Sequence, residues 1–394
     1  MQGCPAASNA TITADNLNPA AYMAQAATAD AADVRRALRT AHPRPADFAA
    51  LLSPAAGSRL EDMAQQARRL TLRHFGKNIT LYVPLYISNH CANGCAYCGF
   101  AADRRYPRRH MTPDEIRLEL AAIRRLGFDE ILLLTGERGP HADFDYLRAA
   151  VAMAAEIFHL VTVEAFPMDQ AEYRGLALAG CQGITIYQET YDPETYIQVH
   201  RWGPKRDYQR RLNTPELALA AGMRTVGLGA LLGLVEPRRD AVSLFLHVQE
   251  LQRRFWRAGF SISFPRLRPE TGGFIPPHPV NDRLLAQIIY AFRICLPDVP
   301  LVLSTREGPA FRDGMAGVGI NKMSIASRTT VGGYQGETRE ANGAQFQISD
   351  HRDIAEFFRM LRSKGLEPVF KSWDRTFSMP QPAAGGADMR VDGP

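Results

Sequence analysis

Short apolar runs alternate with longer stretches of helical periodicity over most of the chain. In the longer stretches apolar residues recur every three or four positions, which is typical of amphipathic helices. The alternation predicts parallel strands joined by helices, and its eight repeats favour a (β/α)8 TIM-type barrel over an open doubly wound sheet, which alternates in the same way. The predicted strands span residues 81–88, 130–136, 160–167, 183–190, 225–234, 260–269, 300–307 and 322–329. The predicted helices span residues 113–126, 144–158, 170–179, 215–221, 241–256, 282–295, 309–315 and 351–364.

The two ends of the chain differ from this repeating middle. Residues 1–30 are rich in Ala, Thr and Asn without a clear period, which predicts a weakly ordered N-terminal arm. Residues 31–76 contain helical patterns and predict an N-terminal helical extension. The barrel is expected over residues 77–374, and residues 375–394, which are rich in Pro, Gly and Ala, predict a loose C-terminal tail.

Composition excludes several classes of protein. The 394 residues are 46% hydrophobic and 22% charged, as in an ordinary globular protein, and six cysteines are too few for a disulfide scaffold. The net charge of +5 does not indicate a nucleic-acid partner. No stretch reaches the ~20 apolar residues of a membrane span, and no secretory signal opens the chain. We therefore expect a cytoplasmic protein.

Three cysteines, Cys91, Cys95 and Cys98, form a C-x3-C-x2-C triad. Thiolates are soft ligands of iron–sulfur clusters and of zinc. Three thiolates without a fourth nearby leave one iron of a cubane cluster open to a small molecule. Zinc prefers four tetrahedral ligands, of which only His90 lies close in sequence, and a disulfide would leave one cysteine over. The spacing favours the open cluster, and a structural zinc or iron–sulfur site in a non-catalytic barrel is the alternative.

Polar residues follow seven of the eight predicted strands. Because the carboxyl ends of barrel strands meet at one face, these residues predict a polar mouth. Four arginines, at positions 266, 268, 306 and 328, belong to this set. Guanidinium groups match carboxylates in shape and charge, so we expect at least one to bind a substrate carboxylate. The alternative for each is an ion pair that ties loops together.

A series of motifs resembles a known family. The triad with its Tyr-Cys-Gly-Phe ending resembles the radical S-adenosylmethionine (SAM) superfamily. Further motifs resemble the aromatic amino acid lyases of that superfamily, above all the tyrosine lyases of thiamine biosynthesis. The likeness runs from about residue 47 to residue 374. The matching runs are residues 81–100, 132–137, 187–191, 227–234, 263–269, 271–273, 303–307 and 332–334.

The resemblance implies a 4Fe–4S cluster on the three cysteines, with SAM on the fourth iron. It assigns Gly136 and Glu137 to the amino group of SAM, although a strand-ending glycine and a solvated glutamate would look the same. The other cofactor assignments are Tyr97 and Gly229 to adenine, Glu189 to the ribose or amino group, and Arg211 to the SAM carboxylate. Tight packing could equally explain the glycine at 229, and Arg211 could be a solvated helix residue.

The resemblance also implies the reaction. A 5′-deoxyadenosyl radical abstracts hydrogen from the amino group of L-tyrosine, and the Cα–Cβ bond breaks to give 2-iminoacetate (dehydroglycine) and p-cresol. Arg306 is assigned to the substrate carboxylate, with Arg268 next in line, and Ser324 or Ser327 to the amino group. The implied partners are an external electron donor and thiazole synthase, which would receive the easily hydrolysed imine.

Two relatives compete with this assignment. The lyase that matures FeFe-hydrogenase carries a second cluster on C-terminal cysteines. This chain has no cysteine after Cys295, so that activity is disfavoured. Tryptophan lyase lacks that second cluster, so tyrosine and tryptophan both remain open as substrates.

Overall fold

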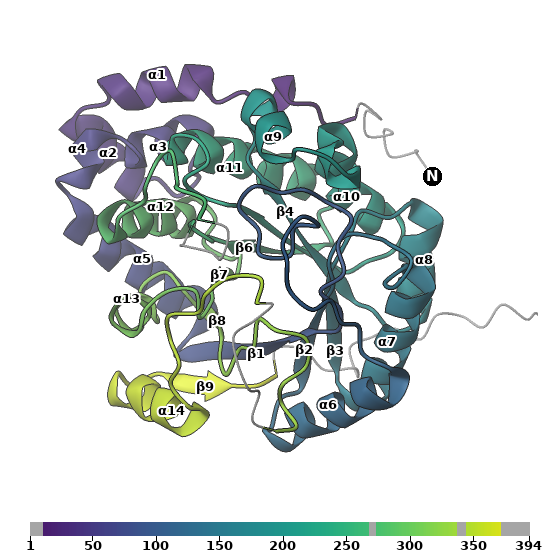
Figure 1. Cartoon of the computed structure of the whole chain (residues 1–394). Helices are drawn as coiled ribbons and strands as arrows, with labels where there is room; N and C mark the ends of the chain where they lie inside the picture. Colours follow the sequence, from purple (N-terminus) through teal and green to yellow (C-terminus); the bar gives the residue numbers. More distant parts are fainter. Residues whose placement is uncertain (1–10, 268–272, 337–343, 372–394) are drawn as a thin grey trace, which may run out of the picture.

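A ring of parallel strands forms the centre of the molecule, and helices surround it (Figure 1). The computed structural model describes residues 11–267, 273–336 and 344–371, and within them eight strands form the ring. The ring closes because β1 pairs with β8 and also with β2. The predicted (β/α)8 barrel is therefore confirmed. Its strands are β1 (Asn78–Tyr86), β2 (Glu130–Leu134), β3 (Leu160–Glu164), β4 (Gly183–Glu189), β5 (Thr225–Ala230), β6 (Gly259–Ser263), β7 (Leu301–Leu303) and β8 (Lys322–Ser324).

All eight predicted strands are present, but all of them end earlier than the apolar pattern predicted. The strand β7 stops at Leu303 instead of residue 307, and β8 stops at Ser324 instead of residue 329. Pairing between the two ends at Leu303 and Met323, so the polar residues that follow belong to loops. A short strand that was not predicted, β9 (Glu367–Val369), pairs with the start of β1. Three residues are too few to show a periodic pattern.

Helices connect the strands and begin at recognisable caps. Thr112 accepts a hydrogen bond from the backbone of Glu115, whose carboxylate accepts one from the Thr112 backbone, so the predicted start of α6 is confirmed. The helices of the barrel are α6 (Pro113–Arg125), α7 (Phe144–Ile157), α8 (Gln170–Leu178), α9 (Pro193–Val199), α10 (Tyr208–Ala220), α11 (Pro237–Arg254), α12 (Asp282–Cys295), α13 (Pro309–Met315) and α14 (Ile354–Ser363).

Two helices of the barrel differ most from the prediction, and each contains a proline. The helix α10 was expected to begin at Pro215, but it begins at Tyr208, where the Asp207 carboxylate accepts from the Arg210 backbone. Pro215 lies inside the helix. The helix α9 was not predicted, although Asp192 and Pro193 form a regular N-cap and first position.

The N-terminal part forms helices outside the barrel. The prediction of a weakly ordered arm is wrong for residues 15–28, which form η1 (Asp15–Leu17) and α1 (Ala20–Thr28). Alanine has the highest helix propensity, so this Ala-rich segment forms a helix without a strong amphipathic period. Leu17 and Ala26 are buried.

Four further helices make up the rest of the extension: α2 (Ala31–Arg39), α3 (Pro45–Leu51), α4 (Pro54–Gly57) and α5 (Leu60–Phe75). Phe48 of α3 stacks on Phe245 of α11 with ring centroids 4.2 Å apart, and its edge meets Phe292 of α12 at 4.8 Å. The extension thus covers the outer side of α11 and α12 (Figure 1). The division of the chain at residues 30, 76 and 374 stays a prediction, and residues 375–394 lie outside the described part.

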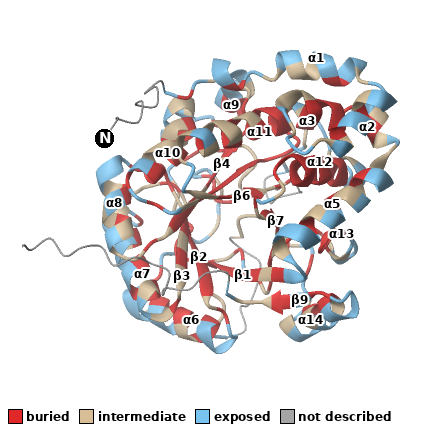
Figure 2. Cartoon of the chain, turned by 180° about the vertical axis from the view of Figure 1, so that it is seen from behind, coloured by how far each residue is buried: buried red, intermediate tan, exposed pale blue. Residues whose placement is uncertain are grey.

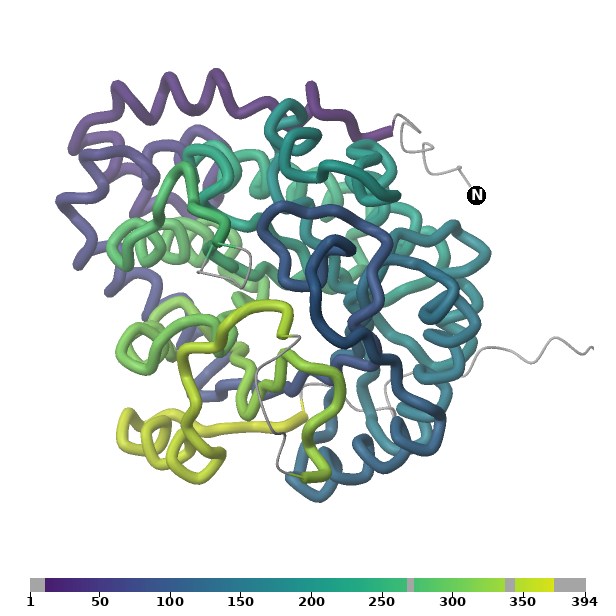
Figure 3. The backbone as a smooth tube through the Cα atoms, in the orientation of Figure 1, coloured from purple at the N-terminus to yellow at the C-terminus, as the bar shows by residue number. Residues whose placement is uncertain are grey.

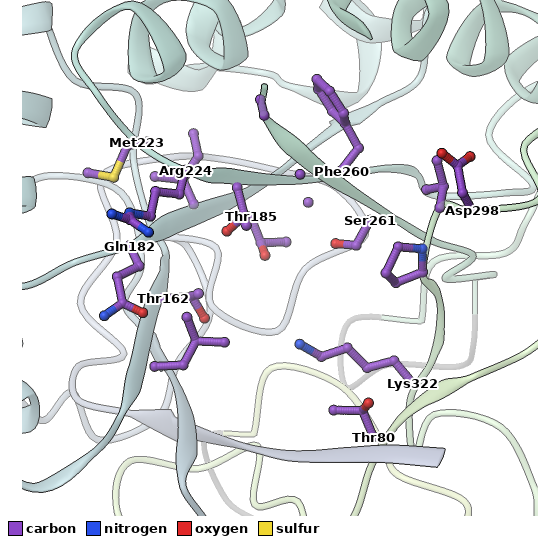
Figure 4. A pocket seen from close by; sticks show the side chains of 18 of the residues that line it. Thr80, Thr162, Gln182, Thr185, Met223, Arg224, Phe260, Ser261, Asp298 and Lys322 are labelled. Carbon is purple, nitrogen blue, oxygen red and sulfur yellow. The ribbon is translucent and has the colours of Figure 1, made fainter. Parts of the chain in front are cut away.

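The strands separate an apolar shell from a more polar interior. Leu81, Val83 and Leu85 of β1 belong to the shell and are fully buried. Figure 2 shows buried residues on the strands of the barrel and exposed ones on the outer sides of the helices. A cavity of about 1330 Å³ opens at the amino ends of the strands (Figure 4). A smaller one, of about 120 Å³, lies at the carboxyl ends. Among the described helices, none is long and apolar enough to cross a membrane.

Candidate active site

The three cysteines lie on the long loop between β1 and α6, which crosses the barrel beside the segment that follows α9 (Figure 3). The Ala96 backbone donates to the Val199 carbonyl at 2.9 Å, and the Gly94 backbone donates to the Trp202 carbonyl at 3.0 Å. The backbones of Cys95 and His200 form an isolated antiparallel β-bridge. Backbone pairing with a segment about 100 residues away therefore fixes the loop in place.

One arginine joins the two ends of the cysteine loop. Arg108 donates to the Asn89 carbonyl at 2.7 Å, before the first cysteine, and to the Phe100 and Ala101 carbonyls at 2.9 and 2.5 Å, after the last one. A second arginine, Arg104, donates to the Ala96 carbonyl at 2.9 Å between the cysteines. These charge-assisted hydrogen bonds satisfy carbonyls that no strand or helix pairs, so they hold the loop in its shape.

The predicted Gly136 and Glu137 lie directly against this loop. A Cβ atom at Gly136 would come within 2.2 Å of the His90 carbonyl oxygen and 2.8 Å of the Cys91 Cβ, so only glycine fits there. The Glu137 side chain is buried and accepts from Asn93 of the cysteine loop at 3.0 Å. The structure therefore brings both residues to the triad, and Glu137 is not the solvated glutamate of the alternative interpretation.

Glu189 stands in an unusual backbone conformation at the end of β4. Its backbone φ angle is +71°, a value that residues other than glycine rarely adopt. Glu189 also lies at a shift in the pairing register between β4 and β5. Its carboxylate pairs with Lys205 and lies 3.7 Å from Arg211. Burial raises the pKa of Glu189, but Lys205 and Arg211 more than offset it, so the pKa lies below its ordinary value and the group is ionised.

Arg211 is buried on α10, contrary to the alternative of a solvated arginine. Its Nε donates to the Tyr187 carbonyl at 2.6 Å. Arg211 and Glu189 therefore form one charged group at the carboxyl ends of the strands, where a SAM carboxylate or amino group would be recognised. Their individual roles stay predictions.

The Tyr97 hydroxyl has a partner that the sequence did not reveal. It lies 2.7 Å from His200 Nε2, while His200 Nδ1 lies 2.7 Å from the Tyr196 carbonyl. Because that carbonyl can only accept, the proton sits on Nδ1, and Nε2 accepts from Tyr97. Burial, helped by Lys205, lowers the pKa of His200 to about 2, so the imidazole is neutral.

Gly229 faces the barrel interior, and its neighbours explain why it is a glycine. A Cβ atom there would come within 2.6 Å of the Tyr187 ring and 2.8 Å of the Ser263 carbonyl oxygen. Glycine is therefore needed at position 229 because atoms of the neighbouring strands, in Tyr187 and Ser263, lie close to its Cα atom. Helix packing, the alternative considered from the sequence, does not account for it, and contact with adenine stays a prediction.

Arg306, Ser324 and Ser327 come together at the ends of β7 and β8. All three line the smaller cavity, as do Tyr97 and Cys98 of the cysteine loop. Ser324 Oγ accepts from the Thr305 backbone and from the Ser327 hydroxyl, both at 3.1 Å. The Arg306 guanidinium lies over the Phe346 ring at 3.6 Å, and no carboxylate of the described residues forms an ion pair with it.

The other arginines of the predicted mouth differ from Arg306. Arg266 is buried and pairs with both Glu307 and Asp282, so it ties loops together. Arg328 is exposed. Arg268, the second choice for the substrate carboxylate, lies outside the described residues.

Sequence reasoning missed Lys205 and His200 as parts of the site. Both follow α9, which was itself missed, and they reach the cysteine loop only through the fold. The Asp-Pro cap of α9 is the one local signal that could have led to them.

Comparison with known proteins identifies the family. Residues 85–247 match the model of the radical SAM superfamily, and residues 263–367 match that of the Biotin and Thiamin Synthesis associated domain. The chain is 43% identical over 345 residues to 2-iminoacetate synthase of Escherichia coli (strain K12), covering 87% of this chain and 91% of that protein. The chain belongs to the 2-iminoacetate synthase family of the radical SAM superfamily.

Solved structures agree with this assignment. The FeFe-hydrogenase maturase HydG from Carboxydothermus hydrogenoformans has a TM-score of 0.80 at 30% identity, covering 91% of this chain and 82% of that one. Methylornithine synthase (PylB) has a TM-score of 0.70 at 21% identity, covering 86% of this chain and 97% of that one, and supports the fold alone.

A 4Fe–4S cluster and SAM are the cofactors of this family and hence of this chain. The cysteine loop fits the cluster. Backbone N–H groups of Glu137 and Phe100 donate to the sulfurs of Cys91 and Cys98 at 3.3 and 3.4 Å, which stabilises thiolate ligands. Burial raises the pKa of Cys98 to about 11, so its proton must leave when the ligand binds.

The zinc alternative fits the same loop less well. Within the described residues, no three His, Cys, Asp or Glu side chains converge on a single metal ion. In a cubane each thiolate binds a different iron, so such convergence is not needed. The His90 ring packs against His141 and His110, with centroids 4.5 and 5.7 Å apart.

Proposed function

We propose that the chain is a radical SAM lyase that cleaves the Cα–Cβ bond of L-tyrosine to 2-iminoacetate and p-cresol, for the thiazole moiety of thiamine. The observation that carries this proposal is the 43% identity to 2-iminoacetate synthase over nine-tenths of that protein. The match to the Biotin and Thiamin Synthesis associated domain supports the link to thiamine.

The cavity beside the cysteine loop suits an amino acid. When bound, the cluster and SAM supply a 5′-deoxyadenosyl radical that removes one hydrogen atom from the substrate. Arg306, which has no carboxylate partner in the described chain, binds the substrate carboxylate in this proposal. Arg268 is the second choice, from the sequence alone.

The hydrogen bonds of the two serines favour Ser327 for the substrate amino group. Ser324 Oγ already accepts two hydrogen bonds, one of them from Ser327. The Ser327 oxygen donates in that contact, so its lone pairs are left for a donor in the cavity. An ammonium or amino N–H group is such a donor.

The cofactor roles follow the same geometry. We assign Gly136, Glu137, Glu189 and Arg211 to the polar groups of SAM. Gly136 and Glu137 contact the cysteine loop, and Glu189 and Arg211 carry opposite charges next to one another. Tyr97 and Gly229 are assigned to adenine.

We further propose that the chain works in the cytoplasm with an external electron donor. Thiolates and clusters are kept reduced there. Because an imine hydrolyses readily in water, direct transfer of 2-iminoacetate to thiazole synthase is expected.

Product analysis tests the function. Anaerobically reconstituted protein is incubated with SAM, dithionite and L-tyrosine, and p-cresol and 5′-deoxyadenosine are quantified in parallel with an L-tryptophan reaction. Equal amounts of the two products from tyrosine support the proposal. An indole product from tryptophan instead would identify a tryptophan lyase, and tightly bound zinc without SAM cleavage would identify a structural metal site.

A further inference from the structure

In the part of the chain that the structure describes, one carboxylate in the cavity at the carboxyl ends of the strands has no hydrogen-bond or ion-pair partner. Glu164, the last residue of β3, lines this cavity together with Arg306, Ser324 and Ser327. Within the described residues, no hydrogen bond or ion pair reaches its side chain, whereas Glu189 in the same cavity pairs with Lys205 and Arg211. The Glu164 side chain is half-buried, and a carboxylate held partly out of water without a partner costs free energy, so its presence at this cavity indicates a ligand that donates to it.

The tyrosine hydroxyls near Glu164 have hydrogen-bond partners other than Glu164. The Tyr86 hydroxyl donates to Gln345 at 2.6 Å, Tyr82 interacts with Ser324, and Tyr187 with Ser263. Burial, followed by the charge of Glu189, raises the pKa of Glu164 to about 7, while Arg211, Lys205 and Arg306 act in the opposite direction. Near neutral pH the group is therefore partly ionised and able to accept a hydrogen bond.

The position of Glu164 in the ring defines which part of a substrate it can reach. In the order of the eight strands, β3 lies four places from β7, so the two stand on opposite walls of the barrel. Arg306 follows β7, Ser324 ends β8, and Ser327 follows β8. An amino acid held by its carboxylate and amino group at that wall extends its side chain across the cavity towards Glu164.

We propose that Glu164 accepts a hydrogen bond from the phenol hydroxyl of the substrate and thereby selects tyrosine over amino acids without a hydroxyl at that position. This inference rests on the proposed function and adds the residue that determines its specificity. A site with a buried acceptor rejects a ligand that lacks the donor, because the acceptor is then left unpaired.

Equilibrium binding tests the inference. Holoenzyme with SAM but without reductant does not turn over, so L-tyrosine and L-phenylalanine affinities can be measured by equilibrium dialysis. We expect the wild type to prefer tyrosine by roughly 100-fold, as for a hydrogen bond to a charged group. In Glu164→Leu the preference should fall to within about 5-fold through weaker tyrosine binding, with phenylalanine binding unchanged.

A matched control is Thr162→Val, two residues earlier on β3 and facing the same interior but lining the other cavity. It should keep the tyrosine preference, and Glu164→Gln, which can still accept a hydrogen bond, should keep part of it. Glu164→Leu with the wild-type preference, or with lost SAM binding instead, would overturn the inference. Failure of the wild type to bind or cleave tyrosine would contradict the proposed function itself.

Discussion

The two ends of the barrel differ in whether the charged side chains that line their cavities have partners of opposite charge. At the amino ends of the strands Lys322 reaches into the large cavity and pairs with Glu130, whose side chain is buried (Figure 4). At the carboxyl ends Glu189 also has a partner, Lys205. Arg306 and Glu164 line the same small cavity, and within the described residues neither of these two forms an ion pair.

This difference separates structural charge from functional charge. A buried ion pair whose partners satisfy each other stabilises the fold only weakly, but removal of one partner is costly. An unpaired charge destabilises the fold until a ligand compensates it, and such groups collect at functional sites. At Arg306 and Glu164 the carboxyl end therefore gives up stability for binding, and the Lys322–Glu130 pair at the amino end does not.

Loss of a cluster ligand should have the largest effect and should leave the fold intact. Cys95→Ala removes one of three thiolates, so we expect iron content near background and SAM cleavage lower by about 10⁴-fold or more. The control Cys295→Ala changes a buried cysteine on α12, far from the loop in sequence, and should retain iron. Iron and sulfide analysis with anaerobic electron paramagnetic resonance measures both variants. Full SAM cleavage by Cys95→Ala would refute the triad assignment.

At the amino end, separation of the ion pair should lower stability without loss of chemistry. Lys322→Met leaves Glu130 without this partner, and we expect the free energy of unfolding to fall by about 2–3 kcal/mol, since Lys322 is partly exposed. The double variant Lys322→Met/Glu130→Gln should recover most of this loss. Anaerobic urea unfolding measures the change, and a parallel fall in SAM cleavage at 25 °C would show that this end also takes part in the chemistry.

The sequence predicted the barrel well because its evidence is local and repeated. Eight apolar runs and the helices between them follow from periodicity, and α12 matches its predicted bounds. Strand ends were placed too late because a strand ends where its neighbour stops pairing, as β7 does at Leu303, and pairing is not local. The helix α1 was missed because alanine-rich segments lack a strong apolar face.

The site was predicted only in part, for the same reason. The cysteines, Gly136 and Glu137 are marked by short motifs, and the structure brings them together. Lys205 pairs with Glu189 from 16 residues away through a segment with no motif. The sequence places Glu164 at a polar position of the third predicted strand, but its lack of a partner among the described residues can be seen only in the folded barrel.

Two arginines of the mouth allow a direct comparison of unpaired and paired charge. Arg306→Ala should weaken L-tyrosine binding by roughly 10- to 100-fold and leave SAM binding unchanged. This is the loss of affinity expected when a charge-assisted pair of hydrogen bonds is removed. Arg266→Ala breaks a buried pair with Glu307 and should mainly lower the thermal midpoint. Dialysis with labelled tyrosine and with SAM measures the first variant. Unchanged tyrosine affinity would place the substrate carboxylate elsewhere, with Arg268 as the next residue to change.

The smallest expected effect is a gain in stability from Glu164→Leu. The pKa of Glu164 is raised to about 7 in the fold from an ordinary 4.5, so ionisation costs stability as the pH rises between these values. The leucine variant has no such cost. We expect it to be more stable than the wild type by about 1 kcal/mol at pH 7, a value reduced from the full shift because the side chain is partly exposed.

This gain should shrink as the pH falls and disappear below pH 4.5, where the wild-type carboxyl becomes protonated in both the folded and the unfolded chain. Urea unfolding of the cluster-loaded protein in the absence of tyrosine, at several pH values, measures it. Thr162→Val on the same strand should show no such pH dependence. A variant that is less stable than the wild type at pH 7 would mean that Glu164 is already compensated within the protein, and the contrast between the two ends of the barrel would then not hold for this residue.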